Sequence, residues 1–128
     1  MRDNDVVELF RPVGRRELDL IAASGHRTFP PRPPDESTFY PVLTRKYAEQ
    51  LARNWNAKDP NSGFRGFVLR FRVRADYLSR FDVHAVGDTS HQEYWIPAEE
   101  LEEFNRHIVG QIEVVAVYDS RCDVGAKR

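Results

Sequence analysis

The clearest pattern along the chain is the alternation of apolar and polar residues between Phe64 and Tyr77. Every second residue from Phe67 to Val73 is large and apolar, and these residues alternate with Val68 and three arginines, Arg70, Arg72 and Arg74. Because neighbouring side chains of a strand point to opposite faces, the pattern predicts a strand with one buried face and one arginine-bearing face. A solvated outer face explains the arginines most simply, and binding of RNA or phosphate is the alternative.

Further runs rich in β-branched and aromatic residues predict five more short strands. These runs are Val6–Phe10, Thr38–Leu43, Phe81–Val86, Ser90–Ile96 and Ile112–Tyr118. Pro12 is expected to close the first run, since proline lacks the N–H that a strand ladder uses. Arg11, which precedes this proline, is therefore expected at the end of a strand.

Helical spacing of apolar residues predicts three helices: Arg15–Ser24, Arg45–Asn56, and a third that begins at Pro97 and ends by Gly110. Thr44 is the expected N-cap of the second helix. The apolar stripe of that helix is expected in the core, and its members are Tyr47, Ala48, Leu51, Ala52 and Trp55. The proline-rich segment Phe29–Pro34 is expected to be an extended, helix-free loop.

The order of these elements places the chain in the α+β class. Strands outnumber helices, and the second half of the chain does not alternate strand with helix as a doubly wound sheet would. We expect a single domain over residues 1–118, with either two packed half-sheets or one strongly bent sheet flanked by short helices. Residues 119–128 are charged and contain glycine, so they are expected to form a flexible tail.

Composition excludes several classes of function. The formal net charge is −1, so no global positive field favours nucleic acid. The only cysteine, Cys122, rules out an intrachain disulfide and a cysteine-based zinc site, and no His/Asp/Glu set has metal-ligand spacing. No apolar run approaches the length of a membrane span, so we expect no membrane and a cytoplasmic location.

The stretch Ser90–Asn105 holds the most unusual combination of side chains. His91, Glu93 and Trp95 alternate with Gln92 and Tyr94, so an extended backbone would place the acid, the imidazole and the indole on one face. Such a face suits a nucleotide or a sugar. An edge strand with a solvated glutamate is the other interpretation, and these residues alone do not decide between the two.

Three segments together resemble the ADP-ribosyltransferase-like family, including its small stand-alone bacterial members. They are ELFRPVG, TFYPVLTRKYAEQLARNW and HQEYWIP, in this order. The resemblance covers roughly residues 8–118 and implies a split or bent mixed sheet of the ADP-ribosyltransferase-like fold, with NAD as substrate. Arg11 belongs to the Arg-Ser-Glu pattern of the family and Tyr40 to the His-Tyr-Glu pattern, and no Ser-Thr-Ser is present.

The resemblance also implies roles for individual residues. Glu93 matches the catalytic glutamate, Arg11 the residue that binds the NAD phosphate or ribose, and Tyr40 the tyrosine that stacks on nicotinamide. His91 lies two residues before the glutamate, where it could orient the acceptor or act as a base. Trp95 offers another aromatic surface for a flat ring. A fixed carboxylate suits this chemistry, because cleavage of the nicotinamide–ribose bond develops positive charge on the sugar.

Three functions follow from these residues. The first is transfer of ADP-ribose from NAD to a protein or nucleic-acid acceptor, or hydrolysis of NAD when water is the acceptor. The second is a non-catalytic module that keeps the fold and binds a nucleotide or a protein. The third is RNA or phosphate binding through the arginine-bearing strand. The acceptor and the oligomeric state are left open.

Overall fold

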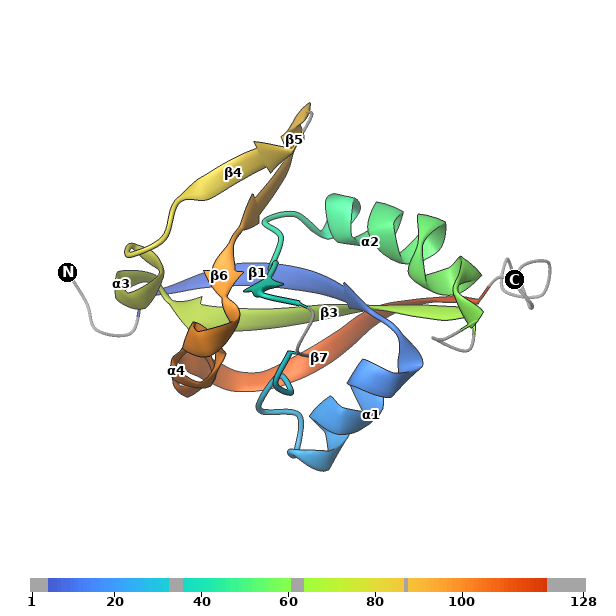
Figure 1. Cartoon of the computed structure of the whole chain (residues 1–128), viewed down its shortest axis with the longest axis horizontal. Coiled ribbons are helices and arrows are strands. Elements are labelled where there is room, and N and C mark those ends of the chain that lie inside the picture. The colour runs from blue at the N-terminus through green and yellow to red at the C-terminus, as the bar shows by residue number, and fades with distance from the viewer. Residues whose placement is uncertain (1–4, 33–35, 61–63, 87, 120–128) are drawn as a thin grey trace.

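The computed structural model describes residues 5–32, 36–60, 64–86 and 88–119 as a mixed α and β structure with antiparallel sheets (Figure 1). The strands are β1 (Val6–Val13), β2 (Thr38–Phe39), β3 (Arg65–Arg74), β4 (Val83–Val86), β5 (Asp88–Tyr94), β6 (Ile96–Pro97) and β7 (Ile108–Asp119). The helices are α1 (Arg15–Ala23), α2 (Arg45–Asn54), α3 (Ala75–Leu78) and α4 (Leu101–Arg106), with 3₁₀ turns η1 (Asn56–Lys58) and η3 (Ala98–Glu100). The prediction of the α+β class is confirmed.

Strand β3 is the centre of the main sheet, which has the order β1-β3-β7 and is antiparallel throughout. Its alternation has the predicted consequence: the side chains from Phe67 to Val73 on one face are buried in the larger hydrophobic core. The strand ends at Arg74, where α3 begins, and so is shorter than the predicted Phe64–Tyr77.

Helices cover both faces of this sheet. Ala48 and Ala52 of α2 pack against Phe10 and Val68 on one face, where they form the smaller hydrophobic core. On the opposite face, the larger core includes Ile21 of α1 and residues of β2, β6 and α4. Figure 1 accordingly shows α1 and α2 on opposite sides of the sheet. Among the described residues, no helix is long and apolar enough to cross a membrane.

Two small antiparallel pairs complete the structure. Strands β2 and β6 pair with each other, and β4 and β5 form a hairpin that extends away from the main sheet in Figure 1. Val42 links the β4–β5 hairpin to the main sheet, because it forms single bridges to Phe10 of β1 and to Glu93 of β5. The described strands thus form three antiparallel sheets, and not the split or bent mixed sheet that the resemblance implies.

Pro12 does not end the first strand, contrary to the prediction. Phe10 exchanges both of its backbone hydrogen bonds with Val42, so its N–H and C=O point away from β3. Pro12, two residues further on, presents its backbone to the same side. The missing N–H therefore costs no hydrogen bond to β3, and β1 continues to Val13 with Pro12 opposite Val68.

Proline and glycine misled two other predicted boundaries. Pro97 does not begin a helix: it pairs with Thr38 in β6, and α4 starts only at Leu101. Gly110 does not separate a helix from a strand, because it lies within β7 at φ +81°, in an irregularity of the β3–β7 register. Glycine adopts this conformation without strain and lets the strand bend.

The last strand is longer than predicted at both ends and runs from Ile108 to Asp119. Asp119 was expected to begin the flexible tail of residues 119–128, but it belongs to β7. It pairs with Arg65 of β3, at a distance of 2.7 Å between Arg65 Nε and Asp119 Oδ2. From residue 120 onward the tail lies outside the described residues. So do Pro33 and Pro34 of the proline-rich segment.

Candidate functional site

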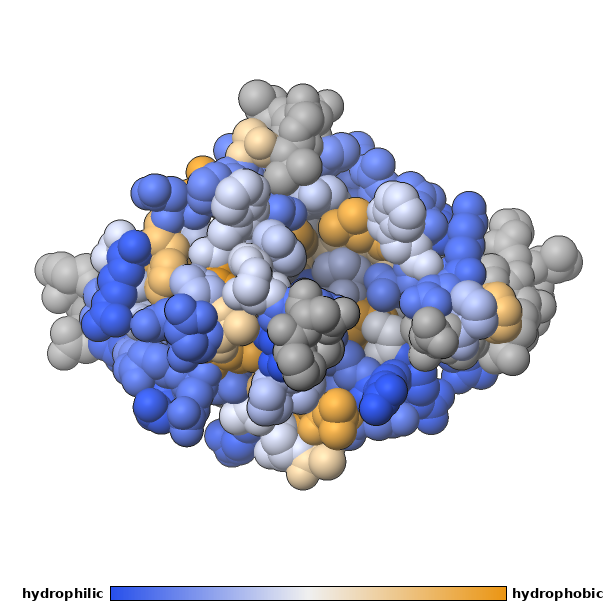
Figure 2. All heavy atoms as spheres, in the orientation of Figure 1, coloured by the Kyte–Doolittle hydropathy of each residue, from blue (hydrophilic) through white to orange (hydrophobic). Residues whose placement is uncertain are grey.

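Three of the residues selected from the sequence line one cavity of about 390 Å³. We call it the Glu93 cavity, and its lining residues are Arg11, Pro12, Tyr40, Val42, Tyr47, Leu51, Trp55, Asn56 and Glu93. Figure 2 shows a hollow next to α2 on the face in view. A second cavity of about 680 Å³ shares Arg11, Pro12 and Asn56 with it. Volumes of this size are typical of small-molecule sites.

Backbone hydrogen bonds of residues 41–43 bring the walls of the Glu93 cavity together. The Val42 N–H donates to the Phe10 carbonyl at 2.8 Å, which fixes the segment to β1. The Leu43 N–H donates to the Gln92 carbonyl at 3.1 Å, which fixes it to β5. Three stretches far apart in the sequence therefore meet along one connection.

Glu93 is partly buried and is held by two neutral donors. The Tyr47 hydroxyl donates to its Oε1 at 3.3 Å, and the Trp95 indole Nε1 donates to its Oε2 at 2.8 Å. Within the described part of the chain, Glu93 makes no ion pair with a lysine or an arginine. The carboxylate is thus oriented at the cavity without a neutralising cation.

His91 is not among the residues that line the cavity. Its ring stacks on that of Tyr47, with centroids 4.5 Å apart and planes 9° from parallel. Tyr94 lies on the other side of β5 and is buried in the larger core. The predicted sharing of one face by His91, Glu93 and Trp95 agrees with these contacts.

Arg11 is buried and its guanidinium is paired with Glu17 of α1. Nε donates to Oε2 at 2.7 Å and Nη2 to Oε1 at 3.0 Å, while the group also lies 4.6 Å from the centroid of the Phe39 ring. The resemblance implied that Arg11 binds the NAD phosphate or ribose. The structure places an internal carboxylate where such an anion would bind.

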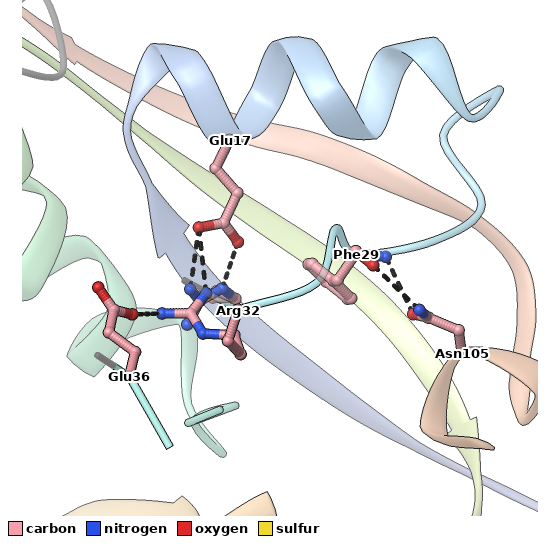
Figure 3. Close-up of polar contacts among 6 residues, drawn as sticks. Glu17, Phe29, Arg32, Glu36 and Asn105 are labelled. Atoms are coloured by element: carbon pink, nitrogen blue, oxygen red, sulfur yellow. Dashed lines mark hydrogen bonds and ion pairs between the residues drawn. The ribbon is translucent and has the colours of Figure 1, made fainter. Parts of the chain in front are cut away.

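The Glu17 carboxylate is shared with a second arginine, Arg32, at 3.6 Å from its Nη1, and Arg32 also pairs with Glu36 (Figure 3). Burial alone would raise the pKa of Glu17. The charges and hydrogen bonds of Arg11 and Arg32 have the larger effect, so the pKa of Glu17 lies below its usual value. The cluster ties β1 and α1 to the proline-rich segment. Figure 3 also shows Asn105 holding that segment by two hydrogen bonds to the Phe29 backbone.

Tyr40 and Trp95 are both about half exposed, at 43% and 46%. Their rings meet edge to face, with centroids 6.3 Å apart. Tyr40 lines the cavity, as a ring that stacks on a ligand must. Trp95 has one face covered by His84, stacked at 3.8 Å, and its N–H is occupied by Glu93, so its ring is less available to a ligand than predicted.

Trp55 is a cavity-lining residue that helical spacing misplaced. Predicted to lie in the core, it is 68% exposed and lines the Glu93 cavity. Helix α2 ends at Asn54, and Trp55 follows with φ −117° and ψ −62°, which turns its side chain away from the apolar stripe. Tyr47 is buried as predicted, but its hydroxyl also reaches Glu93 at the cavity. A hydroxyl within an apolar stripe is the sequence signal that could have indicated this contact.

The arginine-bearing face of β3 carries ion pairs to carboxylates of β1, β7 and α3. Arg70 Nη2 lies 2.5 Å from Glu113 Oε1, and Arg72 lies 3.9 Å from Glu8. Arg74 pairs with Asp76 at 3.4 Å. These contacts favour the solvated-face interpretation over RNA binding. The described residues contain no group of three or more His, Cys, Asp or Glu side chains that could hold a metal ion.

Comparisons with known proteins leave the family open. No protein-family model matches the chain, and no curated protein or solved structure matches it either.

Proposed function

We propose that the protein cleaves the nicotinamide–ribose bond of NAD and transfers ADP-ribose to a protein or nucleic-acid acceptor. When water is the acceptor, the same reaction makes it an NAD glycohydrolase. The observation that carries this proposal is the Glu93 carboxylate, held by two neutral donors at a cavity that Tyr40 also lines. An oriented carboxylate without a paired cation is suited to stabilise an oxocarbenium-like sugar.

In this proposal the bond between ribose C1′ and the nicotinamide nitrogen breaks, and its electron pair leaves with nicotinamide. Positive charge then develops at C1′ and the ring oxygen of the sugar, where Glu93 stabilises it. A lone pair of the acceptor forms the new bond at C1′, and the acceptor loses a proton to solvent, since His91 does not line the cavity. Tyr40 supplies the surface for the nicotinamide ring.

The adjoining cavity supports an elongated ligand such as a dinucleotide, because it shares Arg11, Pro12 and Asn56 with the Glu93 cavity. The role of Arg11 is more restricted than the resemblance implies. Its guanidinium can bind the NAD diphosphate only when its hydrogen bonds to the Glu17 carboxylate break. In the unliganded arrangement Arg11 instead fixes the cavity wall to α1.

The Arg11–Glu17 pair also favours a second candidate, a non-catalytic module that binds a nucleotide or a protein on the same fold. The two candidates differ in turnover. The first requires nicotinamide release that depends on Glu93, and the second requires binding without release.

The decisive experiment measures nicotinamide release by the wild-type protein and by Glu93→Gln. We expect release by the wild type and a loss of about 100-fold or more in the variant, since the amide cannot supply the negative charge. Glu102→Gln is the matched control, because this glutamate is highly exposed on α4 and should leave the rate unchanged.

Binding is followed in the same samples by intrinsic fluorescence. The only two tryptophans of the chain are Trp55, which lines the cavity, and Trp95, which contacts Glu93. NAD should quench this emission in the wild type and in Glu93→Gln with affinities within a few-fold. Quenching without nicotinamide release would support the second candidate, and neither signal would reject both nucleotide functions.

A further inference from the structure

Glu93 differs from most acidic side chains of the described residues in the kind of group that holds it. Glutamates such as Glu17, Glu49 and Glu113 pair with arginines at distances of 2.5–2.8 Å. Glu93 instead accepts one hydrogen bond on each oxygen, from a phenol and from an indole. Both donors are uncharged, so they orient the carboxylate and leave its charge in place.

We propose that Tyr47 and Trp95 are positioning residues that hold Glu93 in one orientation as a reactive anion. This proposal rests on the function proposed above, because only a reaction that develops positive charge gains from the arrangement. An arginine at the same place would orient Glu93 equally well but would cancel much of the charge that the transition state needs.

Both donors are themselves fixed by stacking on an imidazole. Tyr47 is buried at 8% exposure, its backbone N–H is capped by the Thr44 hydroxyl at 3.2 Å, and its ring stacks on His91. Trp95 stacks on His84 in the same way, with planes 7° from parallel. Each hydroxyl or N–H group is therefore directed at Glu93 by packing, so the carboxylate is oriented before a ligand binds.

Burial, together with the charge of Glu93 and the hydrogen bond to it, raises the pKa of Tyr47. The phenol therefore keeps its proton at neutral pH and remains a donor. Among the described residues, the Tyr47 side chain contacts the titratable groups Glu93 and His91, both on β5.

The test is Tyr47→Phe, which removes the hydroxyl but keeps the ring and its stack. We expect kcat for nicotinamide release to fall about 10- to 100-fold while KM for NAD changes less than about 3-fold, since orientation and not binding is lost. Tyr77→Phe is a matched control. Tyr77 also donates to a glutamate, Glu100, at 3.1 Å and stacks on a histidine, His107, but it is not among the residues that line the cavity.

A Tyr47→Phe enzyme with wild-type kcat would overturn the positioning role and leave the proposed function intact. A second readout does not depend on activity: the titration of Tyr47 followed by NMR of its labelled ring carbon. In Glu93→Gln its pKa should fall, because the charge of the carboxylate and the hydrogen bond that Tyr47 donates to it are lost. An unchanged titration would show that the contact does not form in solution, whether or not the protein cleaves NAD. If the wild type releases no nicotinamide, the proposed function fails and the catalytic role of Tyr47 and Trp95 fails with it.

Discussion

Arg11 and Glu17 form a buried pair in which each charge has lost most of its contact with water. Removing one member of such a pair leaves the other as an uncompensated charge, which is more costly than the pair is stabilising. Arg11 also packs over the ring of Phe39, which belongs to the larger hydrophobic core. The pair is therefore a structural requirement of the fold in addition to any part it has in ligand binding.

Glu17→Gln is expected to lower the free energy of unfolding at pH 7 by about 2–4 kcal/mol, because Arg11 remains buried without an anion. Asp19→Asn is the control on the same helix. Asp19 pairs with Arg15 in an exposed i,i+4 arrangement, so its loss should cost less than about 0.5 kcal/mol. Urea denaturation of both variants measures the difference. Equal stability of the two would contradict a structural role for the buried pair.

The pH dependence of stability follows from the same residue. Folding lowers the pKa of Glu17 below its ordinary value of 4.5, so the unfolded state binds the proton more readily than the folded state does. The contribution of Glu17 is fully present above pH 4.5 and is lost as the pH falls through the lower pKa of the folded state. Wild type should therefore lose more stability than Glu17→Gln between neutral pH and pH 3.

Only part of this site could be predicted from residue types. Arg11, Tyr40 and Glu93 could be selected because three segments of the chain resemble the ADP-ribosyltransferase-like family, and all three residues line one cavity. The partner of Arg11 could not, since the turn between β1 and α1 decides whether Glu17 reaches it. The exposure of Trp55 could not be predicted either, because helical spacing includes this residue in the apolar stripe while the helix ends one residue before it.

At the scale of elements, the approach of α2 to β3 sets the position of Tyr47. Gly66 allows this approach: a Cβ on it would lie 2.5 Å from the Ala52 carbonyl oxygen and 3.0 Å from Asn56 Cβ. Since the first of these atoms belongs to the helix backbone, the helix itself would have to move. The sequence shows a glycine at the start of a strand but not the helix that crosses it.

Gly66→Ala is expected to destabilise the protein by about 1–3 kcal/mol, the usual cost of overpacking. It should also weaken nicotinamide release, because α2 carries Tyr47 and leads into Trp55. Asn54→Ala on the exposed side of the same helix should change stability by less than about 0.5 kcal/mol. Unfolding curves and rates for the two variants provide the comparison, and a Gly66→Ala protein as stable as wild type would mean that the helix lies farther from the strand.

Local patterns identified most elements correctly and their ends less well. Alternation in β3 and helical spacing in α1 and α2 reflect one buried face, which a short window of sequence records. Gly110 misled one boundary because its positive φ lets β7 bend without ending. Pro12 misled another because its effect depends on which side of β1 is paired with β3. That information resides in Val42, beyond the reach of any pattern within β1.

At the scale of the whole molecule, the Glu93 cavity lies where the main sheet, α2 and the β4–β5 hairpin meet. Residues 41–43 join β1 to β5 there, so elements from both halves of the chain line the cavity. The arginine-bearing face of β3 lies beside this region, and its arginines already have carboxylate partners. The cavity, and not the sheet face, is therefore the surface on which we base a function.

The most direct test of this account is a crystal structure of Glu93→Gln with NAD bound. We predict that the nicotinamide ring packs against Tyr40 and that ribose C1′ contacts the side chain of residue 93, while Tyr47 and Trp95 keep their places beside it. NAD bound elsewhere, or an empty Glu93 cavity at saturating NAD, would contradict the proposed function.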